Sequence, residues 1–354
     1  MDWDRRDDIL AMRERRRNFH LAGLLLCGTA IALAGVAVGG QDQGGGKQAE
    51  GMRTAPPYWA YAVNPPAAEN DRKAEVVDTS LRRVPNSEVA FAVAQTSDLF
   101  YAPDWHPGGH RPMPGIVAHG RKPKIFACGY CHLPNGFGRP ENANLAGLPA
   151  DYIVQQMSDF KNGLRKSSVP EFLPAVSMGK YEQLASEQEV AEAAAYFTGI
   201  KPKPWIRVLE TDLVPKTRVA GWMLVASEPR EMEPIGARII ETPENLERTE
   251  LRDDTSGFIA YVPVGSITTG KALVTTGGEG KTVPCATCHG TGLQGMKNVP
   301  GIAGRSPSYV VRQIVDMQYG LRAGAGSQQM KPVVAKLNIE DMIAIAAYTA
   351  SLNP

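Results

Sequence analysis

Hydrophobic side chains recur at helical spacing in several parts of the 354-residue chain. The clearest apolar face lies near the C-terminus and consists of Ile339, Met342, Ile343, Ala346 and Ala347. Positions three and four apart form one face of a helix. Asn338 precedes this face, and Asp341 completes a capping-box pattern that begins a helix. Ser186 and Glu189 repeat the same pattern, so they predict a second helix of this kind.

Two further helices are predicted over residues 152–163 and 309–320, each of which ends at a glycine. Residues 203–264 have a different pattern. Short runs of branched and aromatic residues at 205–210, 239–240 and 258–262 predict β-strands there. This composition does not suit a flexible linker, so we expect the segment to pack across both of its neighbouring domains.

The N-terminal residues have the pattern of an anchor or a signal segment. Four arginines within residues 13–17 precede an apolar stretch over 19–40, which is long enough to span a bilayer. The positive-inside rule keeps residues 1–18 in the cytoplasm. The small residues at 32–34 leave cleavage as a signal peptide open, which would release a soluble periplasmic protein. Residues 41–104, rich in glycine and proline, predict a tether followed by a loop-rich segment.

An internal repeat predicts the domain organisation. At an offset of 157 residues, the matched pairs are Cys128 and Cys285, Cys131 and Cys288, His132 and His289, Tyr152 and Tyr309, Gln156 and Gln313, and Arg165 and Arg322. The offset then becomes 152 and pairs Met178 with Met330 and Tyr196 with Tyr348. The chain therefore contains two copies of one mainly helical domain, over residues 105–202 and 265–354.

The strongest chemical signal is a Cys-x-x-Cys-His pattern that occurs twice, at Cys128, Cys131 and His132 and at Cys285, Cys288 and His289. This pattern is the attachment signature of c-type haem, in which both thiols form thioethers and the histidine binds the iron. A four-cysteine zinc site would leave both histidines unexplained. The sequence therefore predicts two covalently bound haem c groups.

The composition of the chain argues against a disulfide-stabilised fold and against nucleic-acid binding. The motifs use four of the five cysteines, so no disulfide framework remains. The formal net charge is +1, which gives no indication of nucleic-acid binding. The second repeat carries 8 basic and 4 acidic side chains, which suits either an acidic partner or an ordinary solvated surface.

From about Trp105 to the C-terminus, excluding 203–264, these motifs resemble the class I cytochrome c family, in particular its di-haem members. The resemblance implies two tandem class I cytochrome c domains, to which the residue patterns above add a short-strand inter-domain segment and an N-terminal membrane helix. It also implies that Met178 and Met330 are the distal iron ligands. They follow the proximal histidines by 46 residues (178 minus 132) and 41 residues (330 minus 289), and both separations suit a loop that passes around the haem edge. The structural alternative for each methionine is core packing.

The resemblance suggests that Arg165 and Arg322, and with them Tyr152 and Tyr309, contact haem propionates. Three alternatives to Met178 remain open for the first haem, namely His106, His110 and His119. The first repeat departs from the family pattern at two positions. Leu133 follows its motif where the second repeat has Gly290, and Ala143 replaces Pro300 near the carbonyl expected to orient the histidine.

Histidine and methionine ligands would fill the iron coordination and favour electron transfer over catalysis. We therefore expect a membrane-tethered electron carrier on the periplasmic side of a bacterial inner membrane. A dehydrogenase or quinol-oxidising complex would be its donor, and a terminal oxidase or smaller cytochrome its acceptor. Two alternatives are the cytochrome subunit of a larger dehydrogenase, and a di-haem peroxidase or sulfur-compound oxidase.

Overall fold

The computed structural model describes residues 55–65 and 77–354. The expected membrane segment 19–40 and the beginning of the tether lie outside these residues. Within the described ranges, no helix combines the length and the apolar character needed to cross a bilayer.

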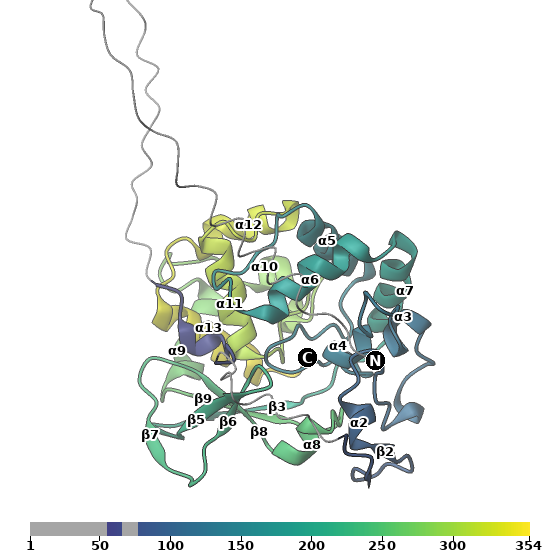
Figure 1. Cartoon of the computed structure of the whole chain (residues 1–354). Helices are drawn as coiled ribbons and strands as arrows, with labels where there is room; N and C mark the ends of the chain where they lie inside the picture. The colour runs from purple at the N-terminus through teal and green to yellow at the C-terminus, as the bar shows by residue number, and fades with distance from the viewer. Residues whose placement is uncertain (1–54, 66–76) are drawn as a thin grey trace, which may run out of the picture. The chain divides into compact units, whose positions relative to one another are not determined.

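Two sets of helices occupy the two repeats (Figure 1). The first set consists of α3 (Gly115–Ala118), α4 (Cys128–His132), α5 (Ala150–Lys161), α6 (Leu173–Leu184) and α7 (Glu187–Thr198). The second consists of α9 (Ser266–Thr276), α10 (Ala286–His289), α11 (Pro307–Gln318), α12 (Ala325–Val334) and α13 (Ile339–Ser351). Helices α5 and α11 begin 157 residues apart (307 minus 150), and α7 and α13 begin 152 apart (339 minus 187). The structure thus confirms the repeat and both of its offsets.

The predicted helix caps are confirmed in both repeats. Ser186 Oγ accepts a hydrogen bond from the Glu189 amide at the start of α7, and the Glu189 side chain accepts one from the Ser186 amide. Asn338 and Asp341 make the same two contacts before α13. Each cap satisfies backbone groups that a helix terminus otherwise leaves unpaired.

Helix α13 packs closely against α9. Gly270 of α9 makes this approach feasible, because a Cβ atom there would lie only 1.9 Å from the Ala344 carbonyl oxygen. The α13 residues nearest to Gly270 are Ala344 and Tyr348, which lie outside the predicted alanine-bearing face. Ala346 and Ala347 are fully buried in this core.

The strands predicted between the repeats are confirmed. Strands β3 (Ile206–Glu210), β9 (Phe258–Val262) and β8 (Ile240–Pro243) form a sheet in that order, with β3 parallel and β8 antiparallel to β9. The sheet lies below α9 and α13 in Figure 1, and β3 contacts α13. Two short pairs were not predicted, β4 (Leu213–Pro215) with β7 (Met232–Pro234) and β5 (Thr217–Ala220) with β6 (Met223–Ala226).

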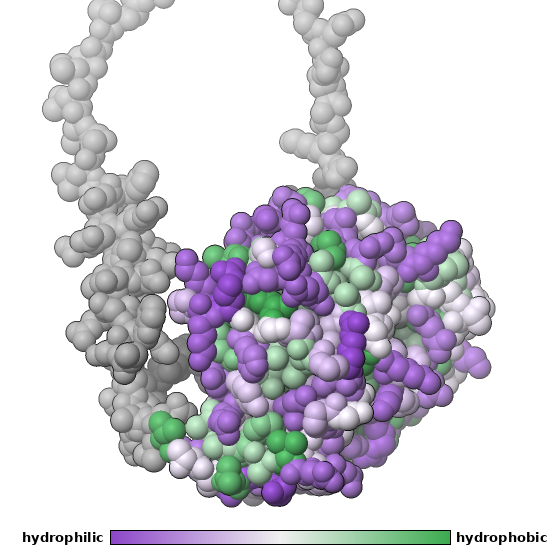
Figure 2. Space-filling model, turned by 90° about the vertical axis from the view of Figure 1, so that its right-hand side faces the viewer, coloured by the Kyte–Doolittle hydropathy of each residue, from purple (hydrophilic) through white to green (hydrophobic). Residues whose placement is uncertain are grey.

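Residues 77–105 pack against the inter-domain segment through a small aromatic cluster. Trp105 is fully buried, and its ring meets Phe91 edge to face at 4.6 Å between centroids. Its indole Nε1 donates a hydrogen bond to the Leu251 carbonyl oxygen at 2.8 Å. This cluster is one anchor of the inter-domain segment on the first repeat. On the face shown in Figure 2, hydrophobic residues form small groups among hydrophilic ones, as expected for a surface in water.

Glu241 of β8 joins the same segment to the second repeat. Its Oε2 atom accepts hydrogen bonds from Ser306 Oγ at 2.8 Å and from the Ser308 amide at 3.0 Å. Its Oε1 atom is buried and has no hydrogen-bond partner among the described residues. Burial raises the pKa of Glu241, and the two serines only partly oppose this effect.

We expect Glu241→Gln to raise the free energy of unfolding near neutral pH by about 1–3 kcal/mol, because an amide avoids burying a charge with an unpaired oxygen. A raised folded-state pKa contributes stability that is complete below the unfolded carboxyl pKa of about 4.3 and is lost as the pH rises through the folded value. The gain should therefore vanish near pH 4 and increase with pH. Denaturant titrations at several pH values test this, with the exposed Glu171→Gln as control. A variant less stable than wild type near neutral pH would contradict it.

Candidate functional site

The first Cys-x-x-Cys-His motif forms the short helix α4, which carries His132 into the interior with only 7% of its surface exposed. His132 Nδ1 lies 2.8 Å from the Ala143 carbonyl oxygen. A carbonyl can only accept, so Nδ1 carries the proton and Nε2 is left as the free metal-binding atom. Burial lowers the pKa of His132, which favours the neutral form that binds metal.

The second motif has the same arrangement. His289 is 8% exposed, and its Nδ1 donates to the Pro300 carbonyl oxygen at 2.8 Å. Burial also lowers the pKa of His289. The difference between Ala143 and Pro300 therefore has no effect on this contact, because each residue contributes its backbone carbonyl.

The difference between Leu133 and Gly290 does affect the backbone. Both residues have positive φ, at 62° for Leu133 and 77° for Gly290, with extended ψ. Glycine adopts this region freely, whereas a residue with a Cβ is strained by about 1–3 kcal/mol. Leu133 is 3% exposed, so its buried side chain offsets part of that strain.

Two adjacent cavities meet at His132. They have volumes of about 80 and 110 Å³ and share His132, Met157 and Met178 in their walls. Cys128 and Cys131 line the smaller and more apolar cavity. Both thiols, the histidine and Met178 thus border the smaller cavity, whose apolar wall suits a porphyrin face.

Polar side chains line the larger cavity. They include Tyr152, Arg165 and Tyr309, three of the four residues expected to contact propionates. The fourth, Arg322, lines neither cavity; it is 7% exposed, and its Nε atom is buried without a hydrogen-bond partner among the described residues. The polar wall that contains Arg165 fits the carboxylate edge of a haem.

Both methionines lie in helices. Met178 lies in α6 and Met330 in α12. Helix α6 packs against α5, and this contact holds Met178 at the cavity beside Met157. At the second site, Met330 and Cys285 pack against the same hydrophobic core, whereas Cys288 is exposed.

Arg165 and Arg322 also reach across to the opposite repeat. Arg165 donates to Tyr309 Oη and to Gln313 Oε1, both at 3.0 Å. Its backbone also pairs with that of Arg322 as an antiparallel bridge.

Arg322 makes the reciprocal contacts. It donates to Tyr152 Oη at 3.1 Å and to Gln156 Oε1 at 2.8 Å. The residues expected at the propionates thus also join the two repeats.

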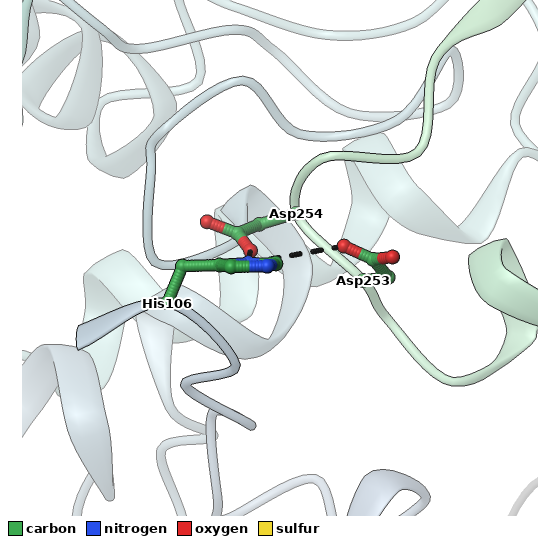
Figure 3. Close-up of side chains that lie close together, drawn as sticks. All are labelled: His106, Asp253 and Asp254. Atoms are coloured by element: carbon green, nitrogen blue, oxygen red, sulfur yellow. Dashed lines mark hydrogen bonds and ion pairs between the residues drawn. The ribbon is translucent and has the colours of Figure 1, made fainter. Parts of the chain in front are cut away.

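The three alternative histidines have other partners. His106 Nδ1 lies 2.6 Å from Asp254 Oδ1 and 3.9 Å from Asp253 Oδ1 (Figure 3). His110 contacts Asp104 at 3.2 Å, and the ring of His119 stacks on Tyr101. None of the three lines either cavity at His132.

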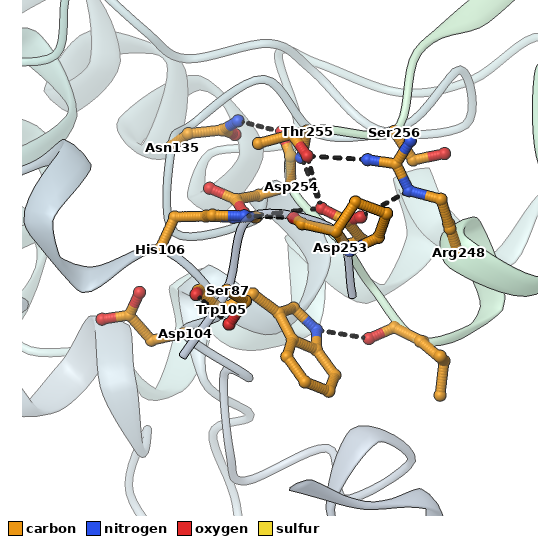
Figure 4. A network of polar contacts seen from close by, with 12 residues as sticks. Ser87, Asp104, Trp105, His106, Asn135, Arg248, Asp253, Asp254, Thr255 and Ser256 are labelled. Carbon is orange, nitrogen blue, oxygen red and sulfur yellow. Dashed lines mark hydrogen bonds and ion pairs between the residues drawn. The ribbon is translucent and has the colours of Figure 1, made fainter. Parts of the chain in front are cut away.

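His106 and the two aspartates bring ligand atoms within 4.8 Å of one another, as a metal site would require. Figure 4 shows that these groups already have partners in a larger network. Arg248 donates to Asp253 at 2.7 Å, and the Asp254 backbone accepts from Asn135. The cluster thus joins the first repeat to the inter-domain segment.

Two arginines of the interface were not found by sequence reasoning. Arg305 is 7% exposed and donates to the Asn144 carbonyl oxygen at 2.7 Å and to Ala146 at 3.1 Å. Arg252 of the inter-domain segment lies on Tyr130 of the first motif. At the 157-residue offset Arg305 corresponds to Leu148, so the repeat contained no signal for it.

Known proteins resemble up to 65% of this chain, although no family model matches it. Cytochrome c4 from Azotobacter vinelandii is 26% identical over 236 residues, which cover 65% of this chain and 86% of the relative. The thiosulfate dehydrogenase electron acceptor of Thiomonas intermedia is 26% identical over 65% of this chain and 80% of its own length. Cytochrome c-554(548) from Halomonas halodenitrificans is 37% identical over 75 residues, which are 21% of this chain and 90% of that protein. The solved structure of Acidithiobacillus ferrooxidans cytochrome c4 aligns with 64% of this chain and 98% of its own, at 18% identity and a TM-score of 0.42.

Proposed function

Because the chain belongs to the di-haem class I cytochrome c family and carries two covalently bound haem c groups, we propose that it is an electron carrier tethered to the periplasmic side of a bacterial inner membrane. Its donor would be a dehydrogenase or a quinol-oxidising complex. Its acceptor would be a terminal oxidase or a smaller cytochrome.

The observation that carries this proposal is the shared cavity of His132 and Met178. A bound haem supplies a one-electron couple at each site. His132 and His289 would each present Nε2 to the iron, and the backbone carbonyls at Nδ1 hold their rings in orientation. Met178 and Met330 would supply the other axial ligands. Two protein ligands leave no open position for oxygen or peroxide, so electrons would pass without bond formation to a substrate.

The proposed location depends on the arginines at 13–17 and the apolar stretch at 19–40. Arginines retained in the cytoplasm direct the following chain outward. The haem domains would then lie in the periplasm, held by an uncleaved anchor. Membrane fractionation of the full chain and of a variant lacking residues 1–40, exported by a cleavable signal, distinguishes the anchor from other attachment. A shortened protein that still sediments with membranes would contradict the anchor as the sole tether.

Ferric-state spectroscopy with a redox titration, run with and without peroxide, tests the carrier proposal. We expect two one-electron transitions, low-spin ferric haems with the weak sulfur-to-iron band, and no rapid peroxide turnover. A high-spin ferric haem with peroxide turnover would instead indicate a di-haem peroxidase.

One relative favours a second candidate, a cytochrome subunit of a larger dehydrogenase. The Thiomonas intermedia protein is described as the electron acceptor of thiosulfate dehydrogenase. This role can be tested by mixing the oxidised di-haem protein with a purified thiosulfate dehydrogenase and thiosulfate, and following haem reduction by stopped flow. Reduction no faster than with thiosulfate alone would exclude this enzyme as the donor.

A further inference from the structure

The two attachment motifs lie in different surroundings. Tyr130, between the cysteines of the first motif, is 7% exposed and belongs to a hydrophobic cluster. Its counterpart at the 157-residue offset is Thr287, which is exposed, as is Cys288 beside it. The inter-domain segment covers the first motif, and the second motif faces solvent.

Arg252 is the residue of the inter-domain segment that contacts the first motif. Its guanidinium carbon lies 3.4 Å from the centroid of the Tyr130 ring. Its Nη1 atom donates a hydrogen bond to the Tyr130 carbonyl oxygen at 2.8 Å. Two separate contacts thus hold this cation against the turn of α4 between Cys128 and Cys131, the two thiols that would attach the first haem.

The charge of Arg252 has no ion-pair partner among the described residues. Its neighbours Asp253 and Asp254 instead contact Arg248 and His106 (Figure 4). The other nearby cation, Arg139, is paired with Glu141 at 2.5 Å. Arg252 therefore places a positive charge without an ion-pair partner beside the first motif, in a partly buried position where water screens it less than at the surface.

We propose that Arg252 raises the reduction potential of the first haem above that of the second. Oxidation adds one positive charge to a haem, and a nearby fixed cation disfavours that change. Thr287 is the residue of the second motif that corresponds to Tyr130, and no arginine of the described residues donates a hydrogen bond to it. Thr287 and Cys288 are open to solvent, which stabilises the oxidised form. Electrons would then enter or leave through the second haem, whose attachment motif is exposed, and collect on the first. This inference depends on the two attached haems, and not on which proteins exchange electrons with them.

Optical redox titration of the intact di-haem protein tests the proposal. In Arg252→Gln we expect one of the two one-electron transitions to show about tenfold weaker electron affinity, which corresponds to about 59 mV for a one-electron couple. Arg252→Lys keeps the charge and should leave both transitions close to wild type. Arg218→Gln removes an exposed arginine of β5 in the same segment and should also change neither. Haem content and thermal unfolding show whether each variant is intact, and Arg252→Met replaces Arg252→Gln if the latter does not fold.

The Met330→His variant assigns the transitions, because it should displace only that of the second haem. The proposal is overturned if Arg252→Gln moves neither transition, moves the one that Met330→His also moves, or has the same effect as Arg252→Lys. If Met330→His moves neither transition, the distal ligand assignment fails. In that case, loss of the transition when Cys128 and Cys131 are both replaced identifies the first haem.

Discussion

Replacing Met178 with histidine should lower the reduction potential of one haem by about 0.1 V or more and leave the other unchanged. Axial ligands alone set haem potentials over a range of about 0.8 V, and a thioether favours ferrous iron more than an imidazole does. The weak sulfur-to-iron band of that haem should disappear, while the ferric iron stays low-spin. Redox titration and ferric-state absorption measure both effects.

Met157 provides a matched control for this prediction. It lines the same two cavities as Met178, but from the middle of α5, where we interpret it as a packing residue. Met157→His should leave both potentials close to wild type. If Met157→His lowers a potential and Met178→His does not, the distal ligand of the first haem is Met157.

The second large effect is expected from Trp105→Ala, which should reduce the free energy of unfolding by about 3–5 kcal/mol. The substitution removes a fully buried indole, its edge-to-face contact with Phe91 and its hydrogen bond to Leu251. These contacts hold residues 77–105 and the inter-domain segment together. Denaturant unfolding, followed by far-ultraviolet circular dichroism and by haem absorption, measures the loss.

Trp105→Phe separates the contribution of aromatic packing from that of the hydrogen bond to Leu251. It keeps an aromatic ring but leaves the Leu251 carbonyl unpaired, so we expect a smaller loss of about 1–3 kcal/mol. A Trp105→Ala protein within about 1 kcal/mol of wild type would show that this aromatic cluster does not support the fold.

Local patterns predicted the elements whose structure depends on neighbouring residues. Ser186 and Asn338 each begin a helix by accepting a hydrogen bond from the backbone amide three residues later in the sequence. Both caps could therefore be predicted from the sequence. The branched residues of β3, β8 and β9 likewise marked these strands. The internal repeat predicted more of the fold than the helix caps or the strand composition did. It paired residues that are far apart in the sequence without requiring that their contacts be known.

What remained hidden depends on residues distant in sequence. Arg252 and Tyr130 are 122 positions apart, and nothing near either residue indicates that they meet. The helix around Met178 was also missed. It begins beside a proline and has no strongly amphipathic pattern, so its packing against α5 is what defines it. The strain at Leu133 could be anticipated only from the glycine at the matched position.

The reciprocal contacts of Arg165 with Tyr309 and of Arg322 with Tyr152 have a consequence for how the two haem sites stay together. Each repeat presents the same residues to the other, which is the isologous arrangement of a two-fold homodimer. Two separate polypeptides joined in this way would dissociate on dilution. Here one polypeptide contains both repeats, and the covalent connection between them fixes the effective concentration of each repeat at the other. The distance between the two haems is therefore independent of how much of the protein a cell makes.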